Sequence, residues 1–217
     1  MDNKQRKIKI EKPRSSMHIR SNRKISDIFD EDVFEDMLIS DCTISNLIAN
    51  KVSFNRVIFK RVIFSEVILN SLDVTDVRFE NCDLSNVDFR GAIVHRVEFV
   101  NCKLMGSNIS DGTLQNVYIK GCNFNFAFMK FIKMKKVILE ESMFKSSNFQ
   151  NSKLEKVVFK KCDLRLSQMS GTSLSGIDLS DSKIEGIGVG IEDVKGMIIS
   201  PIQSLYFTKL LGVLIKE

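Results

Sequence analysis

The chain has 217 residues, of which 43% are apolar and 27% are charged, so it can bury a core and is not disordered by composition. Its two histidines leave few groups for acid–base or zinc chemistry. The sequence contains no run of about 18 apolar residues, so no membrane span is predicted. The net charge of +5 is uneven: residues 1–25 hold nine Lys or Arg and two acidic residues, so the rest of the chain carries a net −2.

The N-terminal segment, residues 1–25, is expected to be a basic, flexible tail. It lacks the apolar stretch that follows the basic start of a secretory signal. With five cysteines, an odd number, this predicts a cytoplasmic protein with reduced thiols. Residues 26–38 are acidic with interspersed apolar side chains, and we expect them to form an N-terminal cap or an incomplete first coil of the repeat that follows.

A period of five residues occupies positions 39–199. Every fifth residue in this range is apolar at all 33 positions, without insertion or deletion. The residue two places earlier is small or branched, and Glu192 is its one charged exception. A helix needs a period of 3.6 and a simple strand a period of two. The pattern therefore predicts units of a three-residue strand and a two-residue corner, with the second and fourth places inward and the third outward.

A second period, of twenty residues, gives the number of sides. The five cysteines are separated by multiples of twenty, as is a series of valines from Val57 to Val157. Four five-residue sides per coil place each series in one column, and about eight coils follow from the length of the repeat. Stacked coils bond through backbone N–H groups, which explains why no proline occurs between Pro13 and Pro201.

Units such as NCDLS (81–85), NVDFR (86–90), KCDLR (161–165) and GIDLS (176–180) resemble the pentapeptide-repeat family, whose units read A-(D/N)-L-x-x. The resemblance covers residues 39–199. It implies an all-β fold, a right-handed quadrilateral parallel β-helix.

The C-terminal segment, residues 200–217, predicts a short α-helix followed by an apolar strand. Ser200 is a good N-cap, Pro201 a good first helical residue and Gly212 a good helix end. The segment is similar to the C-terminal helix of the gyrase-protecting quinolone-resistance pentapeptide proteins, which implies a homodimer; the alternative is a cap on the same chain. The candidate dimer residues are Ile202, Leu205, Tyr206, Leu210, Leu211, Val213 and Ile215.

The polar and thiol side chains of the repeat favour packing over chemistry. Cysteines in an inward column behave as small hydrophobic residues, although their spacing along the solenoid would permit a disulfide. His95 at a corner is expected to be solvated. The third-place Asp and Asn residues occupy the repeat's own Asp/Asn position. We therefore expect no enzyme activity, no catalytic residue, no metal or other cofactor and no small-molecule substrate.

The stretch from Phe124 to Lys136 is the most unusual on the outside. In the repeat frame Phe126, Phe128 and Phe131 point outward, and the fold does not need them there. The alternatives are a hydrophobic corner covered by lysine stems and a docking patch for a protein. The candidate patch consists of Phe126, Phe128, Phe131, Lys130, Lys133, Lys135, Lys136, Lys153 and Lys156.

The family resemblance implies binding to DNA gyrase or topoisomerase IV by a rod that mimics DNA in width and negative charge. Outward charges in this repeat instead alternate in sign from coil to coil, which indicates pairing between coils and weakens DNA mimicry. Three hypotheses remain: a scaffold for a protein partner, with gyrase or topoisomerase IV the most specific candidate; nucleic-acid binding through the basic tail and lysines; and a structural protein without a specific partner.

Overall fold

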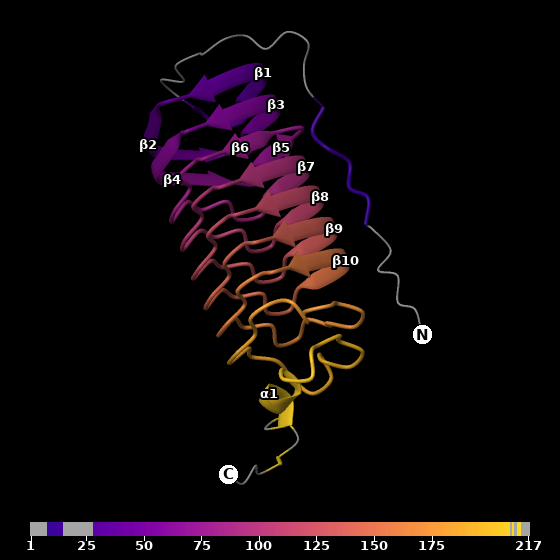
Figure 1. Cartoon of the computed structure of the whole chain (residues 1–217). Coiled ribbons are helices and arrows are strands. Elements are labelled where there is room, and N and C mark those ends of the chain that lie inside the picture. The colour runs from indigo at the N-terminus through magenta and orange to yellow at the C-terminus, as the bar shows by residue number, and fades with distance from the viewer. Residues whose placement is uncertain (1–7, 15–27, 209, 211, 214–217) are drawn as a thin grey trace.

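The described part of the chain is a parallel β-solenoid that ends in a short helix (Figure 1). The computed structural model describes residues 8–14, 28–208, 210 and 212–213. The strands are β1 (Val33–Ser40), β2 (Thr43–Asn50), β3 (Ser53–Lys60), β4 (Ile63–Asn70), β5 (Asp73–Thr75), β6 (Arg78–Glu80), β7 (Ile93–Val100), β8 (Thr113–Lys120), β9 (Lys133–Glu140) and β10 (Lys153–Lys160), and the helix is α1 (Ser204–Thr208).

The strand register confirms the period of twenty. In the larger sheet, ordered β1-β3-β5-β7-β8-β9-β10 with β6 beside β3 and β7, each residue pairs with the residue twenty positions on, as Ile93 does with Thr113. The strand ladder makes about six turns. This is fewer than the eight coils expected, because the last coils keep the register through isolated bridges, out to Asp178 and Ile198, and not through strands.

The four sides of a coil are not equivalent. Two successive sides form one eight-residue strand, which turns its corner at a residue with positive φ, such as Asn116 at 55°. The other two sides pair as β2 with β4 and then only through single bridges. The expected three-residue strands are therefore seen only in β5 and β6 among the described residues, because the chain elsewhere stays extended through one corner of four.

The backbone ladder explains the distribution of proline. Lys103 and Asn123 donate their N–H groups to the carbonyls of Cys82 and Cys102, one coil back, at 2.9 and 3.0 Å. A proline at such a position would remove the donor and its ring would collide with the neighbouring coil. The absence of proline from the repeat is thus a condition of stacking.

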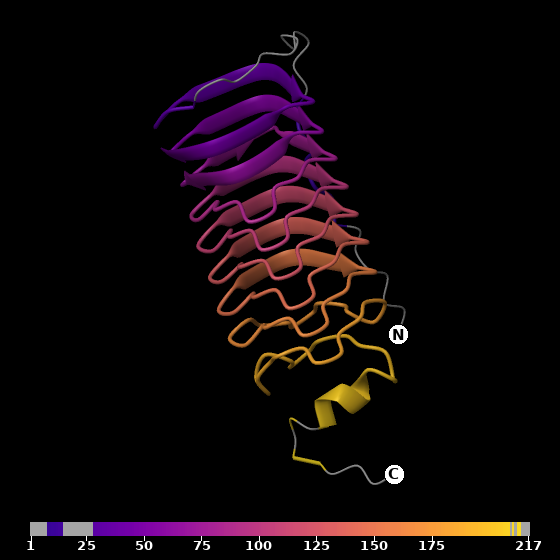
Figure 2. The ribbon, with the colours of Figure 1, turned by 90° about the vertical axis from the view of Figure 1, so that its left-hand side faces the viewer.

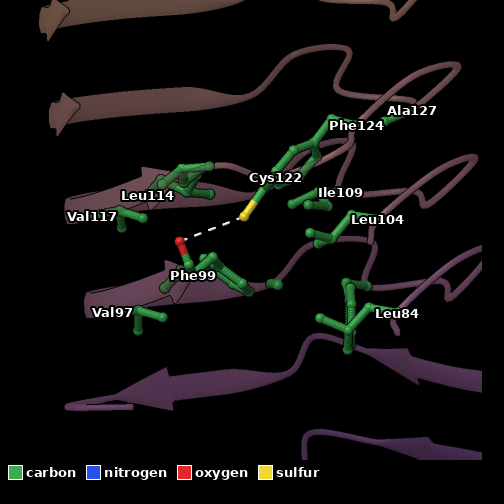
Figure 3. Packing of buried hydrophobic residues seen from close by; sticks show 14 of the residues in the cluster. Leu84, Val97, Phe99, Leu104, Ile109, Leu114, Val117, Cys122, Phe124 and Ala127 are labelled. Atoms are coloured by element: carbon green, nitrogen blue, oxygen red, sulfur yellow. Dashed lines mark hydrogen bonds between the residues drawn. The ribbon is translucent and has the colours of Figure 1, made fainter. Parts of the chain in front are cut away.

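The core is a continuous column of inward side chains (Figure 3). The rings of Phe59, Phe79 and Phe99 stack with centroids 4.8 Å apart and planes within 3° of parallel, one ring per coil. Figure 3 shows Phe124, Ala127 and Cys122 on adjoining sides of one coil, packed over residues of the coils before it. Burying a side chain of this size contributes about 1.5–3 kcal/mol.

At the N-terminal end the ladder begins earlier than the expected boundary at residue 39. β1 starts at Val33 and already pairs with β3, so residues 33–38 of the predicted cap belong to a first coil. Ile28, which precedes this coil in the chain, is buried in the core. Asp36 lies at the corner of this coil, and its carboxylate accepts two bonds from Arg56 at 2.6 and 2.9 Å.

At the C-terminal end, α1 lies beyond the last coil (Figure 2). The α-helix begins at Ser204 and not at Pro201, since a turn over 201–203 places the Gln203 amide in the open end. Its Nε2 donates to the carbonyls of Leu179 and Ser182 at 2.9 and 2.7 Å. Gly212, at φ 69°, ends the helical turns, and the N–H of Val213 donates to the Thr208 carbonyl in Schellman geometry.

Candidate functional site

The predicted outward phenylalanines are on the surface. Phe126, Phe128 and Phe131 are 51–55% exposed, whereas Phe124 of the same coil is 1% exposed. Phe126 and Phe131 sit at successive corners and Phe128 on the side between them. We call these three residues the aromatic corner.

The backbone at the aromatic corner is costly for phenylalanine. Phe126 and Phe131 have φ values of 62° and 57°, in the left-handed region, which costs a bulky L-residue about 1–2 kcal/mol. The fold imposes this conformation at every such corner from Glu31 to Gly176, and neighbouring coils meet it mostly with Gly, Asn, Asp or Ser. Above and below Phe126 the column holds Gly106 and Ser146, and around Phe131 it holds Asp111 and Asn151. Packing therefore does not account for the two phenylalanines.

The lysines of the predicted patch continue from the aromatic corner onto the next side. Lys133 and Lys153 are paired residues of β9 and β10 and both are exposed. Lys136 and Lys156 repeat the arrangement one corner further on. Lys135 forms an ion pair with Glu155 at 3.4 Å, and Lys130 is half-buried beside Phe131 in sequence. The predicted patch thus wraps around the solenoid over several sides and does not lie on one flat face.

Charges elsewhere on the solenoid pair between neighbouring coils, as the sequence predicts. The carboxylates of Asp41, Glu98 and Glu140 accept bonds from Arg61, Arg78 and Lys160 at 2.5–2.6 Å, each twenty residues away. By contrast, Lys133 and Lys153 are neighbours of like charge, and so are Lys136 and Lys156. Like charges on neighbouring strands destabilise the ladder.

The cysteines of the inward column are packed in the interior as free thiols. Cys82, Cys102, Cys122 and Cys162 are buried and Cys42 is half-buried, and all five are free thiols. The Cys162 thiol points at the Leu139 carbonyl at 3.3 Å, and burial raises its pKa to about 11, so it stays neutral. Figure 3 shows the corresponding contact of Cys122 with the Phe99 carbonyl, at 3.5 Å.

The third-place Asp and Asn residues have a local structural role. Asp83, Asn108 and Asn123 each accept the N–H of the residue two positions on, at 3.0–3.1 Å. Asp88, Asn148, Asp163 and Asp178 do the same. This bond closes the turn at the end of a unit, which explains the residue type without any catalytic role.

His95 differs from the expectation of a solvated corner. It is half-buried beside Arg96, whose Nη1 lies 3.1 Å from its ring, and burial lowers its pKa. Among the described residues no group of three or more His, Cys, Asp or Glu could hold a metal ion. In the same part of the chain, no helix is long and apolar enough to cross a bilayer.

The candidate dimer residues divide into two sets. Ile202, Leu205 and Val213 are 48–72% exposed, and Tyr206 is 39% exposed with its hydroxyl donating to Glu185 at 3.3 Å. Leu210 instead packs on the core together with Phe207, so it does not lie on the exposed surface with the other candidate residues. Leu211 and Ile215 lie outside the described residues.

One contact with the solenoid, made by an N-terminal segment, was not predicted from the sequence. Residues 8–14, which we name the strap, lie along the flank of the solenoid beside the larger sheet (Figure 1). The N–H groups of Glu11 and Arg14 donate to the side-chain oxygens of Asn116 and Asp76 at 3.3 and 3.0 Å. The expectation of a flexible tail is therefore wrong for these residues; the rest of residues 1–25 lies outside the described part.

Comparisons with known proteins agree with the repeat. The family model described as a pentapeptide repeat region matches residues 52–129 and 72–149, and the model described as pentapeptide repeats (8 copies) matches 142–181. No curated protein matches the chain in sequence.

Solved structures are similar in fold. HetL, a pentapeptide repeat protein involved in heterocyst differentiation regulation from the cyanobacterium Nostoc sp. strain PCC 7120, is 12% identical, with coverage of 78% of this chain and 90% of HetL and a TM-score of 0.51. Full-length QnrB1, a plasmid-mediated fluoroquinolone resistance protein, is 14% identical, with coverage of 81% of this chain and all of QnrB1 and a TM-score of 0.38.

Proposed function

Because the family models together match residues 52–181, this chain belongs to the pentapeptide repeat family, and we propose that it is a non-catalytic scaffold whose outer surface binds a protein partner. One observation carries the proposal: Phe126 and Phe131 are exposed at corners where the left-handed backbone disfavours them. Exposed aromatic side chains commonly anchor protein interfaces.

The chemistry of the partner follows from the neighbouring side chains. Like-charged pairs, Lys133 with Lys153 and Lys136 with Lys156, lie next to the aromatic corner. A partner with an apolar pocket and an acidic rim would relieve their repulsion and cover the phenylalanines. DNA gyrase and topoisomerase IV are the most specific candidates, on the resemblance of the repeat and the C-terminal segment to quinolone-resistance proteins.

A supercoiling assay tests this partner. Purified gyrase, and topoisomerase IV in a parallel relaxation assay, are titrated with micromolar protein with and without a fluoroquinolone. We expect protection from the drug or inhibition of the enzyme, and its loss in Phe126→Ser with Phe131→Ser. Phe29→Ser is the matched control, since Phe29 is 67% exposed and lies outside the aromatic corner. No effect of the wild-type protein in either assay removes both enzymes as partners.

The like-charged lysines also support a second candidate, a nucleic-acid partner. Phosphate contacts release counterions, so binding would weaken steeply as salt is raised. Affinity for duplex and single-stranded DNA is measured at several salt concentrations for the wild type and for Lys133→Gln with Lys153→Gln. A salt-independent affinity, or one that the substitutions leave unchanged, rules this candidate out.

We also propose that the protein is a homodimer in a reducing, cytoplasmic compartment. The exposed apolar side chains of Ile202, Leu205 and Val213 support a self-complementary contact at the C-terminal end. The free state of all five cysteines supports the compartment. A thiol count on protein alkylated with iodoacetamide in denaturant at cell lysis tests the latter, with five alkylated cysteines expected; the denaturant is needed because four of the thiols are buried in the folded chain.

A further inference from the structure

The strap is held mainly by its backbone. The N–H groups of Glu11 and Arg14 donate to the side chains of Asn116 and Asp76, and the Asn116 amide donates back to the Glu11 carboxylate at 3.5 Å. These two acceptors are 1% and 7% exposed, so they are buried polar groups that need a donor. Asp76 also accepts two bonds from Arg96 at 2.6 and 2.7 Å, which fixes its carboxylate.

The strap and the solenoid share a register. Asp76 and Asn116 occupy the same corner column two coils apart, about 9.6 Å at the usual strand spacing of about 4.8 Å. The three residues from Arg14 to Glu11 span about 10 Å when extended. Another three-residue step places Ile8 at Lys156, two coils further, and Ile8 and Lys156 do line one groove. An extended peptide thus meets this corner once every third residue.

The groove at the Ile8 end of the strap is only partly filled by the strap. It has a volume of about 810 Å³. One outward column of successive coils lines it, in which Asp178 interrupts the apolar residues Tyr118, Ile138, Val158 and Ile198. Charged side chains of both signs lie beside this column: Glu140, Lys156, Lys160 and Asp181. Apolar residues in an outward column are unexpected on a soluble face, and a single isoleucine side chain covers only part of them.

From this geometry we propose that the flank groove is a docking site for an extended peptide segment of a partner protein, and that the strap occupies it as an internal, displaceable ligand. Recognition through backbone N–H groups tolerates different sequences, while the apolar lining favours an apolar side chain at the place that Ile8 occupies. The preferred partner segment is therefore extended and apolar at this place.

This proposal does not depend on the aromatic corner. The strap column passes through Asn116, and Phe126 lies two corners further along the chain, diagonally opposite in a four-sided coil. Lys156 borders both sites, but the substitutions that test them, at Phe126 and Phe131 and at Ile8, Ile10 and Asn116, leave it in place. Failure of the proposed function and failure of the peptide site therefore give separate results.

The test uses the full chain with the strap released. Ile8→Asp with Ile10→Asp removes the apolar contacts of the strap, and amide exchange of residues 8–14, followed by mass spectrometry, verifies release. A fluorescein-labelled peptide KIKIEKPR, which copies residues 7–14, is then titrated and its anisotropy measured. We expect the released variant to bind at least tenfold more tightly than the wild type, whose own strap competes.

Three controls define the site. Adding Asn116→Gly to the released variant keeps a residue that accepts positive φ but removes the acceptor, and should weaken binding at least tenfold. A peptide with both isoleucines replaced by aspartate should not bind. A peptide of different sequence and the same pattern, KVKVQKPR, should bind the released variant and, in excess, speed amide exchange of the wild-type strap.

Four results overturn the proposal. They are equal affinity of KIKIEKPR for wild type and released variant, no binding to a variant whose strap exchange shows release, binding that Asn116→Gly leaves intact, and no effect of KVKVQKPR on the wild-type strap. Far-UV circular dichroism of each variant confirms that the solenoid is folded.

Discussion

At the scale of the residue, polar side chains in the interior of a coil are tolerated when they form hydrogen bonds with the backbone. Ser147 lies on an inward place and donates its hydroxyl to the Phe144 carbonyl at 2.6 Å, while Ser142 and Ser182 take places in the cysteine column and accept backbone N–H groups. A small polar side chain is therefore tolerated wherever the neighbouring coil offers a partner. Ser167 is the exception among the described residues, since its buried hydroxyl has no partner.

Ser167→Ala should stabilise the protein by about 1 kcal/mol, because it removes a buried polar group that makes no hydrogen bond. Ser147→Ala is the matched control in the same column and should destabilise by about 1 kcal/mol, since it removes a made bond. Urea unfolding of the two variants measures both. A loss of stability in Ser167→Ala would contradict this account of the column.

Glu140 predicts how acid weakens the coil stack. Bonds from Lys160 and from the Tyr118 hydroxyl, both at 2.6 Å, hold the pKa of its carboxyl below the ordinary value of 4.5. A carboxyl with a lowered folded-state pKa contributes stability above its unfolded pKa and loses it as pH falls. The wild-type unfolding free energy should therefore fall more steeply below about pH 4.5 than that of Glu140→Gln. Glu155→Gln, at an exposed carboxylate, is the control and should keep the wild-type slope.

At the scale of the element, the segment around α1 caps the solenoid on one side and exposes apolar side chains on the other. The sequence pattern did not separate these two roles. Phe207 and Leu210 pack on the core and Gln203 satisfies the end carbonyls, so one side of this segment caps the solenoid. Ile202 and Leu205 are left outside. A helical pattern gives the spacing of apolar residues, but the orientation of a five-residue helix depends on the end that it covers.

Ile202→Lys with Leu205→Lys should convert the proposed dimer to a monomer without loss of stability, because both side chains are exposed on the single chain. Light scattering measures the mass and thermal unfolding the stability. Phe207→Ala is the control that should lower stability through the cap. A wild-type mass of one chain, or a double variant that remains a dimer, contradicts the dimer proposal.

At the scale of the whole molecule, the repeating coil could be predicted from the sequence, but the strap that lies along its flank could not. The repeat was predictable because the inward places of an unbroken twenty-residue register are apolar or small, with Glu192 as the one charged exception. The strap was not, because Arg14 meets Asp76 and Glu11 meets Asn116 over 62 and 105 residues, and two of these three bonds use backbone donors that leave no pattern in the sequence. The outward direction of Phe126 followed from the repeat frame, whereas its left-handed backbone required the structure.

The central claim is that the aromatic corner is kept for binding and not for folding, and the free energy of unfolding tests it most directly. In Phe126→Asn with Phe131→Asn, relief of the left-handed backbone should offset the lost half-buried contacts, so stability should change by less than about 1 kcal/mol. Phe124→Ala, in the same coil but buried, should cost about 3–5 kcal/mol. A loss of that size in the double variant would show that the fold itself needs the aromatic corner.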